Sequence, residues 1–163
     1  MAATPAPVLT IDAAALWAEE QRRAGRRVVF TNGVYDLVHP GHIEYLEAAK
    51  AAGDVLIVAV NSDRSVRANK GPSRPILPED ERAELIAGLR AVDAVVIFDA
   101  ETPADVIRRV QPDVLVKGAD WAADAIVGRD TVEARGGQVL RIDLVAGYST
   151  TAIVEKVRRL PRT

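Results

Sequence analysis

The chain has 163 residues, of which 48% are hydrophobic, and its formal net charge is −2. A chain of this length can bury one core without help from metal ions or disulfides. The absence of cysteine excludes disulfides, zinc–thiolate sites and thiol nucleophiles. The weakly negative charge gives no general attraction to a polyanion, so we expect no nucleic-acid partner.

The first residues lack the basic flank and the apolar run of a signal peptide. No later segment approaches the roughly 20 consecutive apolar residues that a helix needs to span a bilayer. We therefore expect a cytoplasmic protein that has no membrane partner.

Hydrophobic periodicity and the positions of glycine and proline divide the chain into helices and strands. Short β-branched runs indicate buried strands, whereas apolar residues at helical spacing indicate helices. In chain order we expect a flexible lead-in (1–11), a helix capped by Asp12 (12–23), a strand (26–31), a loop (32–39), a helix (40–52), a strand (54–60), a long loop (61–78), a helix (78–89), a strand (94–98), a helix (102–110), a strand (113–117), a polar stretch with a short helix, a strand (138–142) and a final helix (149–160).

Strands that alternate with helices predict an α/β fold with a single Rossmann-like, doubly wound parallel sheet. We divide the chain into an N-terminal lead-in and helix (1–25) and a main domain (26–160). In such sheets ligands bind outside the carboxyl ends of the strands, where the strand order reverses. Three loops at strand ends are chemically unusual and are expected to form the site: 31–42, 116–121 and 147–151.

The two histidines of the chain, His39 and His42, lie three positions apart in the segment HPGH, where a strand gives way to a helix. Pro40 suits the first turn of a helix and places His39 at its cap. Gly41 has no Cβ, so an anion can approach the backbone at the positive end of the helix. The segment therefore predicts a phosphate site flanked by two imidazoles.

Two imidazole N–H groups at a phosphate suit in-line displacement at the α-phosphorus of a nucleoside triphosphate, because preplaced donors stabilise the charge that develops on its oxygens. The alternative is that His39 only caps the helix and His42 only packs, but their spacing at a helix start favours the anion site. Asp36 is a candidate ligand for Mg²⁺ on the triphosphate, or else a turn residue.

The segment HPGH resembles the HxGH signature of the nucleotidyltransferase superfamily. It occurs together with FTNGVYDLVHPGH, VNSD, KGPSRPI, VKGADW and GYSTT, in this order. Over residues 26–159 the chain resembles the adenylyltransferase domain of the bacterial heptose-phosphate enzymes, the ADP-heptose synthases. The resemblance implies transfer of AMP from ATP to D-glycero-β-D-manno-heptose 1-phosphate, which gives ADP-heptose and pyrophosphate for lipopolysaccharide or other heptosylated glycans.

Carried over by position, the resemblance implies that His39, His42 and Lys70 act on the phosphates as catalytic residues. Lys70 would reach them from a mobile loop that also carries Arg67 and Arg74. The implied nucleotide-binding residues come from the loops at the strand ends: Thr31, Asn32, Gly33, Val34, Tyr35, Gly41, Lys117, Gly118, Asp120, Trp121, Tyr148, Ser149, Thr150 and Thr151. ATP with Mg²⁺ and a sugar phosphate are the implied substrates.

The last motif departs from the superfamily pattern, because Val154 stands where a basic residue often binds the leaving phosphates. A non-catalytic nucleotide-binding module is therefore one alternative. Base choice depends on backbone contacts that the sequence hardly reveals, so a cytidylyl- or guanylyltransferase for another phosphorylated sugar or polyol is a second alternative. The sequence also leaves open a homodimer and a separate sugar kinase in the same pathway.

Overall fold

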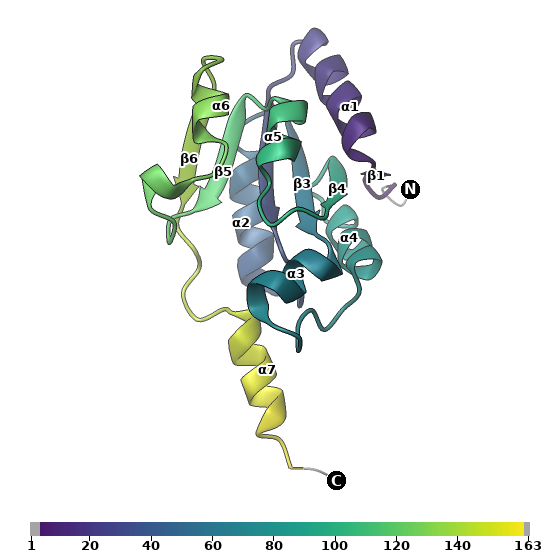
Figure 1. The fold of residues 1–163 in the computed structure, drawn as a ribbon, viewed down its shortest axis with the longest axis vertical. Coiled ribbons are helices and arrows are strands. Elements are labelled where there is room, and N and C mark those ends of the chain that lie inside the picture. Colours follow the sequence, from purple (N-terminus) through teal and green to yellow (C-terminus); the bar gives the residue numbers. More distant parts are fainter. Residues whose placement is uncertain (1–3, 162–163) are drawn as a thin grey trace.

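The structure is a computed structural model that describes residues 4–161. Within this range six parallel strands form one sheet, in the order β1-β4-β3-β2-β5-β6 (Figure 1). The strands are β1 (Val8–Leu9), β2 (Val28–Gly33), β3 (Val55–Asn61), β4 (Ala94–Phe98), β5 (Val114–Gly118) and β6 (Gln138–Ile142). The order runs outward from β2 in both directions, which confirms the predicted α/β fold with a doubly wound, Rossmann-like sheet.

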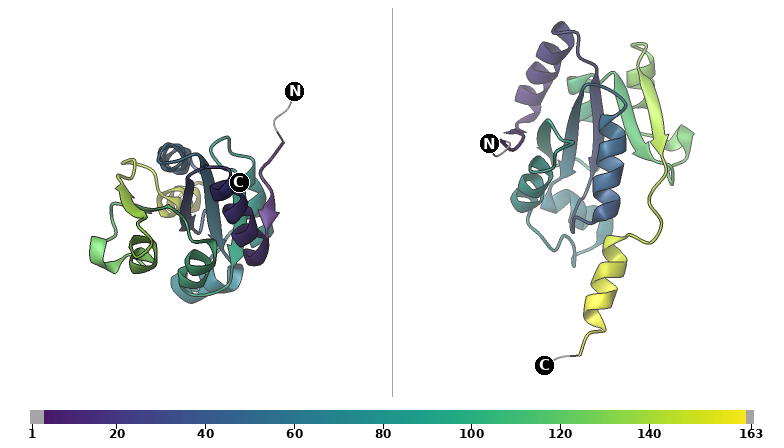
Figure 2. Two further views of the ribbon diagram at one scale, coloured as in Figure 1. Left: turned by 90° about the horizontal axis from the view of Figure 1, so that it is seen from above. Right: turned by 180° about the vertical axis from the view of Figure 1, so that it is seen from behind.

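Helices cover both faces of the sheet, so the central strands β2, β3, β4 and β5 are mostly buried, whereas the edge strands β1 and β6 are not (Figures 1 and 2). The helices are α1 (Ile11–Arg23), α2 (Pro40–Lys50), α3 (Asp63–Lys70), α4 (Glu79–Ala87), α5 (Ala104–Val110), α6 (Arg129–Glu133) and α7 (Thr150–Arg158), with a short 3₁₀ turn at Ala123–Ala125. Residues of α1, α5 and α6 pack on one face, and residues of α2 and α4 pack on the other. Within β2, Val28 and Phe30 join the first core and Val29 joins the second, as the two-residue period of a strand requires.

The N-terminal segment is more ordered than the sequence predicted. Val8 and Leu9 pair with Val95 and Val96 at the edge of the sheet, although 1–11 was expected to be a flexible lead-in. A two-residue strand is too short to show a hydrophobic period. Residues 1–3 of this lead-in, and of the predicted segment 1–25, lie outside the described residues.

The cap of α1 also differs from the prediction. The Oγ1 atom of Thr10 accepts a hydrogen bond from the amide of Ala13 at 3.2 Å, so Thr10 is the cap. Asp12 instead lies in the first turn, where its negative charge suits the positive end of the helix.

The loop predicted over 61–78 contains helix α3, so this part of the prediction was wrong. Ser62 begins the helix, because its Oγ accepts a hydrogen bond from the amide of Ser65 at 3.1 Å. The helix buries only Ser65 and Val66, and two positions cannot produce an apolar period. Lys70 therefore stands at the end of a helix rather than in a mobile loop.

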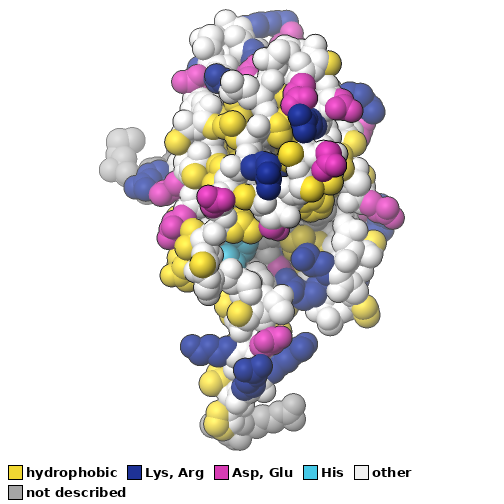
Figure 3. Space-filling model, turned by 90° about the vertical axis from the view of Figure 1, so that its left-hand side faces the viewer, with side chains coloured by type: hydrophobic (Ala, Val, Ile, Leu, Met, Phe, Trp, Pro, Cys, Tyr) yellow, Lys and Arg dark blue, Asp and Glu magenta, His cyan; other side chains and the backbone are white. Residues whose placement is uncertain are grey.

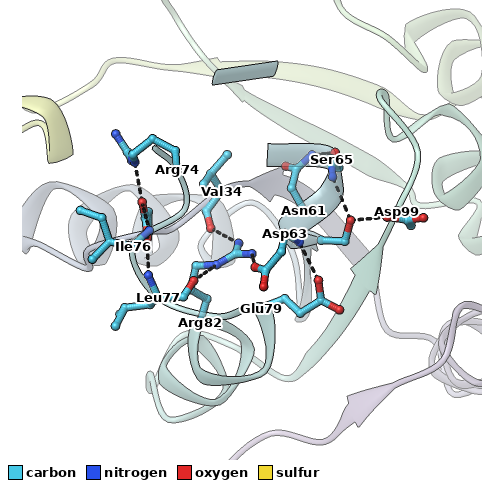
Figure 4. Close-up of polar contacts among 12 residues, drawn as sticks. Val34, Asn61, Asp63, Ser65, Arg74, Ile76, Leu77, Glu79, Arg82 and Asp99 are labelled. Atoms are coloured by element: carbon cyan, nitrogen blue, oxygen red, sulfur yellow. Dashed lines mark hydrogen bonds and ion pairs between the residues drawn. The ribbon is translucent and has the colours of Figure 1, made fainter. Parts of the chain in front are cut away.

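The segment between α3 and α4 is held by Asp36, which binds Arg74, Ile76 and Leu77, the three residues labelled in Figure 4. The Asp36 carboxylate accepts hydrogen bonds from Arg74 Nε at 2.6 Å and from the amides of Ile76 and Leu77 at 2.8 and 2.9 Å. Its side chain is fully buried. These protein donors occupy both carboxylate oxygens, which speaks against the predicted Mg²⁺ site at Asp36.

Arg82 on α4 is the largest fully buried side chain in the described part of the chain. Its guanidinium donates to the carbonyl oxygens of Leu77 and Val34, at 2.9 and 2.7 Å, and to Asp63 Oδ1 at 2.8 Å (Figure 4). One side chain thereby ties α3 and α4 to the loop that follows β2.

The last helix, α7, extends away from the sheet (Figures 1 and 2). None of its residues is buried. Only its first turn contributes to the cleft described below. Among residues 4–161, no helix is both long enough and apolar enough to cross a membrane.

Asp36→Asn is expected to destabilise the fold in a pH-dependent way. Burial raises the pKa of Asp36, but the hydrogen bonds from Leu77, Arg74 and Ile76 outweigh burial, and the net pKa lies below the ordinary value of 3.8. The ionised carboxylate therefore stabilises the folded state fully above pH 3.8, and this stabilisation is lost as the pH falls through the lowered pKa.

We expect Asp36→Asn to lower the free energy of unfolding by about 2 kcal/mol at pH 7. Urea unfolding measured from pH 7 down to pH 3 should show this difference shrinking at the acid end. The exposed Asp124 offers a control, and Asp124→Asn should change little at any pH. A difference that stays constant down to the lowest pH would contradict the assignment.

Arg82→Met is expected to lower the free energy of unfolding by about 3 kcal/mol, because it leaves two carbonyl oxygens and Asp63 without their buried donor. The matched control is Arg90→Met, since Arg90 pairs with Glu47 at an exposed position. Urea unfolding of both variants tests the difference. Equal midpoints for the two variants would refute the role given to Arg82.

Candidate active site

A cleft of about 400 Å³ opens at the carboxyl ends of β2 and β5, where the strand order reverses. Figure 3 shows the histidines inside a hollow between the sheet domain and the projecting α7, with basic side chains on the rim. All three predicted catalytic residues and most of the predicted nucleotide-binding residues line this cleft: Asn32, Gly33, Val34, Tyr35, His39, Gly41, His42, Lys70, Gly118, Asp120, Trp121, Tyr148, Ser149, Thr150 and Thr151.

The two histidines stand at the start of α2, with His39 at the cap and His42 in the first turn. Their rings stack with centroids 3.7 Å apart and planes inclined by 17°. Tyr35 contacts His42 edge-on at 5.3 Å, and Tyr148 stacks on His39 at 6.0 Å. Aromatic neighbours on both sides therefore fix the imidazoles in one orientation.

The hydrogen bonding of the pair indicates which ring nitrogens face a ligand. His42 Nδ1 accepts from the His39 backbone N–H at 3.4 Å, so the proton of a neutral His42 ring lies on Nε2. His39 Nδ1 is buried and has no hydrogen-bond partner among residues 4–161. The cleft thus contains one oriented N–H donor and one unsatisfied ring nitrogen, which a ligand can satisfy.

Both imidazoles are neutral at pH 7, because the pKa of each lies below the ordinary value of 6.5. Burial, followed by the charge of His39, lowers the pKa of His42 from 6.5 to about 4. Burial also lowers the pKa of His39. A neutral imidazole can donate a hydrogen bond to a phosphate oxygen, and a bound polyanion would favour the protonated form.

Gly41 is required by the packing at the start of α2. A Cβ at this position would lie 3.0 Å from Tyr148 Cβ and 3.1 Å from His39 Nδ1. A larger residue would therefore push His39 and Tyr148 apart. The predicted approach of an anion to the backbone at this helix start stays a prediction.

A second helix start faces the same cleft. Ser149, Thr150 and Thr151 line it at the beginning of α7. Ser149 caps this helix, because its Oγ accepts from the amide of Ala152 at 3.0 Å. Two positive helix ends, those of α2 and α7, therefore meet at one cleft, and both favour a polyphosphate.

The loop after β5 forms a third wall. Gly118 is buried, and a Cβ there would lie 2.4 Å from Asp120 Oδ1, so the glycine leaves room for the Asp120 side chain. The side chain of Trp121 is 51% exposed and borders the cleft. An exposed indole beside a phosphate site suits stacking on a nucleoside base.

Two predicted nucleotide-binding residues lie elsewhere. Thr31 is fully buried, and its hydroxyl bonds to the Tyr45 hydroxyl at 2.8 Å and to the Val116 carbonyl at 3.0 Å. β2 turns this side chain into the protein and away from the cleft, and the predicted contact of Thr31 with the nucleotide stays a prediction. Burial raises the pKa of Tyr45 to about 12, so this buried pair stays neutral.

Lys117, the second of these residues, lines an adjoining cavity rather than the cleft itself. It is only 7% exposed. Its Nζ contacts Asn32 Oδ1 and lies 5.9 Å from the centre of the Trp121 ring. Burial lowers the pKa of Lys117 to about 8, so the side chain still carries a positive charge at neutral pH.

Some residues that line the cleft were not predicted from the sequence. Tyr45, Leu144 and Val145 line it, and they resemble ordinary core positions in sequence. Arg74 borders the cleft while bound to Asp36, a contact between residues 38 positions apart that no local pattern reveals. Among residues 4–161, no group of three or more acidic, histidine or cysteine side chains could hold a metal ion.

Comparisons with known proteins identify the family of the chain. The family described as Cytidylyltransferase-like matches residues 30–156. The Bifunctional protein HldE of Gluconobacter oxydans (strain 621H) is 51% identical over 154 residues, covering 94% of this chain and 32% of that protein. The Bifunctional protein HldE of Azorhizobium caulinodans is 56% identical over 134 residues, covering 82% of this chain and 28% of that protein. The chain thus spans about a third of these curated relatives.

Solved structures share the fold. The lipopolysaccharide core biosynthesis protein from Thermoplasma volcanium GSS1 has a TM-score of 0.64 and 31% identity, covering 74% of this chain and 99% of that one. A protein with unknown function from Archaeoglobus fulgidus has a TM-score of 0.56 and 21% identity, covering 76% of this chain and 93% of that one, which supports the fold alone. Since the family match covers more than half of the sequence, the chain belongs to the Cytidylyltransferase-like family and is a nucleotidyltransferase.

Proposed function

We propose that the chain transfers AMP from ATP to D-glycero-β-D-manno-heptose 1-phosphate and releases pyrophosphate. One observation supports the proposed phosphate chemistry. The stacked His39–His42 pair at the start of α2 shares a cleft with the start of α7. This arrangement offers ring and backbone N–H donors to a triphosphate from two sides. Residues 26–160 are proposed to form the nucleotidyltransferase domain.

The reaction is a direct displacement. A phosphate oxygen of the acceptor forms a bond to the α-phosphorus, while the bond from that phosphorus to the oxygen bridging to the β-phosphate breaks. Pyrophosphate leaves with the electron pair of the broken bond. His42 Nε2–H donates to a non-bridging oxygen whose charge grows in the transition state, and Lys70 compensates charge from the end of α3.

The choice of a heptose phosphate as the acceptor rests on the motif resemblance and on the names of the relatives. The similar curated proteins are called Bifunctional protein HldE, and the Thermoplasma protein is described as a lipopolysaccharide core biosynthesis protein. Because this chain matches about a third of each bifunctional relative, we propose that it corresponds to their nucleotidyltransferase part. A separate sugar kinase would then supply the phosphorylated acceptor, and a homodimer stays a prediction.

In this proposal Mg²⁺ binds to the site only together with ATP. Asp36 is occupied by protein donors, so the ion would be held by the triphosphate oxygens, as is common for Mg²⁺ in phosphoryl-transfer sites. A cytoplasmic location belongs to the same proposal, because ATP is available there.

One observation supports each of the two alternative functions. A cytidylyl- or guanylyltransferase is supported by the nature of the base site, in which the exposed Trp121 can stack on any base. A non-catalytic binding module is supported by Val154, which stands on α7 in place of a basic residue. Base preference and turnover separate these alternatives from the proposed function.

A panel of substrates tests the proposed function directly. Pyrophosphate release should appear with ATP and D-glycero-β-D-manno-heptose 1-phosphate, and it should be far slower when CTP or GTP replaces ATP. Glycerol 3-phosphate and hexose 1-phosphates serve as comparison acceptors. Turnover with CTP or GTP but not with ATP would establish the first alternative, and nucleotide binding without pyrophosphate release from any pair would establish the second.

His42→Ala is expected to lower kcat by about a hundredfold without unfolding the protein, because it removes a donor that is strengthened in the transition state. Glu44→Ala is the control, since Glu44 is exposed on the same helix, lines neither the cleft nor its neighbouring cavity, and should leave kcat within about twofold. Steady-state kinetics at saturating substrate, with thermal unfolding of each variant, give the comparison. A loss below threefold would remove His42 from the mechanism.

A further inference from the structure

A second hollow, of about 540 Å³, lies at the end of the sheet opposite the histidine cleft. It forms where the turns after α1, α5 and α6 lead into the amino ends of β2, β5 and β6 (Figure 1). Its charged lining consists of Arg22, Arg26, Arg27, Arg135 and one carboxylate, Asp113, and we call it the arginine hollow. None of the residues that line it also lines the cleft, so the two are separate features.

The positive charge of the arginine hollow is not balanced by ion pairs. Among residues 4–161, none of its four arginines pairs with a carboxylate, whereas most of the other arginines in this range do. The carboxylate of Asp113 accepts instead from the amide of Val28, at 2.8 Å. Because the whole chain carries a formal net charge of −2, this is a local excess of positive charge.

Two of the arginines are anchored to the same atom. Arg22 Nη1 donates to the carbonyl oxygen of Gln111 at 3.0 Å, and Arg135 Nη1 donates to the same oxygen at 2.8 Å. Guanidiniums that share one acceptor lie close together, and their like charges repel each other. Burial lowers the pKa of Arg22; the charge of Asp113 opposes this shift, and the charge of Arg135 adds to it.

Helix capping explains only part of this arrangement. Gln111 ends α5, and cations commonly bind the carbonyl groups at the end of a helix. In Arg22 and Arg135 this contact uses Nη1 alone, and among residues 4–161 their Nε and Nη2 atoms donate to no acceptor. The Nε–Nη2 edge of a guanidinium is a pair of parallel donors that binds phosphate or carboxylate in a bidentate way. Two such edges therefore remain for a ligand.

The size and charge of the arginine hollow suit a small anion with several charges. The end of each neighbouring helix contributes a partial negative charge of about half a unit, which is less in sum than four full positive charges. The volume lies in the range of roughly 300–1,000 Å³ that is usual for small ligands. Linked phosphates offer enough terminal oxygens to accept from two guanidinium edges at once, which a single carboxylate does not.

We propose that the arginine hollow is a second anion site, which binds the oligophosphate group of a small molecule between the free edges of Arg22 and Arg135. Arg26, whose exposed side chain makes no hydrogen bond within residues 4–161, supplies a further cation. The oligophosphate can be free pyrophosphate or part of a nucleotide. The site does not depend on the proposed function, because it shares no lining residue with the cleft.

Calorimetric titration with inorganic pyrophosphate, without Mg²⁺, tests this site. The variant that combines Arg22→Gln and Arg135→Gln should bind one pyrophosphate fewer per chain than the wild type, or bind it at least about tenfold more weakly. Arg26→Gln removes no hydrogen bond seen within residues 4–161, so it should weaken the same binding event by severalfold without changing the thermal unfolding midpoint. This single variant separates loss of binding from loss of stability.

The matched control combines Arg158→Gln and Arg159→Gln, which remove the same charge from exposed positions at the end of α7. This control should bind pyrophosphate as the wild type does. Equal losses in the two double variants would show a general charge effect and overturn the proposal, as would unchanged binding in the Arg22 and Arg135 variant. The expected difference is one bound pyrophosphate whether or not the cleft also binds one, so failure of the proposed function would not change it.

Titration with ADP distinguishes the two sources of the oligophosphate. The wild type is again compared with the Arg22 and Arg135 variant, so that binding at the cleft is common to both. ADP that binds the lost site more tightly than pyrophosphate would assign the arginine hollow to a nucleotide, and ADP that binds it no more tightly would assign it to free pyrophosphate. Both results support an oligophosphate site, whereas a site that binds neither compound would overturn it.

Discussion

The site depends on how the connection from β2 to α2 is held, because this short segment carries Tyr35 and leads into both histidines. Asp36 binds the segment to the loop before α4 through Arg74 and two backbone amides. Arg82 binds it again through the carbonyl of Val34. The side chains of Asp36 and Arg82 are fully buried, so water does not compete for these contacts. Preorganised donors are effective only when their supports are fixed, and here the supports are polar groups inside the protein.

Burial also sets the protonation state of the two histidines in the cleft. The imidazoles are stacked and largely removed from water, which makes two adjacent positive rings unfavourable before a ligand arrives. With both imidazoles neutral, the positive potential of the cleft comes from the helix ends and from Lys70. A triphosphate would bring the charge that stabilises a protonated imidazole, so ligand binding and histidine protonation are coupled.

The sheet and the histidine cleft were predictable because their signals are local. A buried parallel strand is an apolar run, and HPGH encodes a cap, a helix start and two ring donors within four residues. Helix α3 was missed because it buries only two residues, and the buried partners of Thr31 and Asp36 could not be predicted because they lie far away in the chain. The arginine hollow has no sequence signal, since Arg22, Gln111 and Arg135 converge only when the ends of α1, α5 and α6 pack together.

The valine at position 154 changes where positive charge can act on the leaving phosphates. In this chain α7 meets the cleft only through its first turn, and Val154 is half-buried one turn further along. Arg74 is already paired with Asp36, so it compensates a buried carboxylate rather than a ligand. Lys70 is the lysine that borders both the cleft and the adjoining cavity. In the proposed transfer, charge compensation would therefore come from Lys70 at the end of α3 rather than from α7.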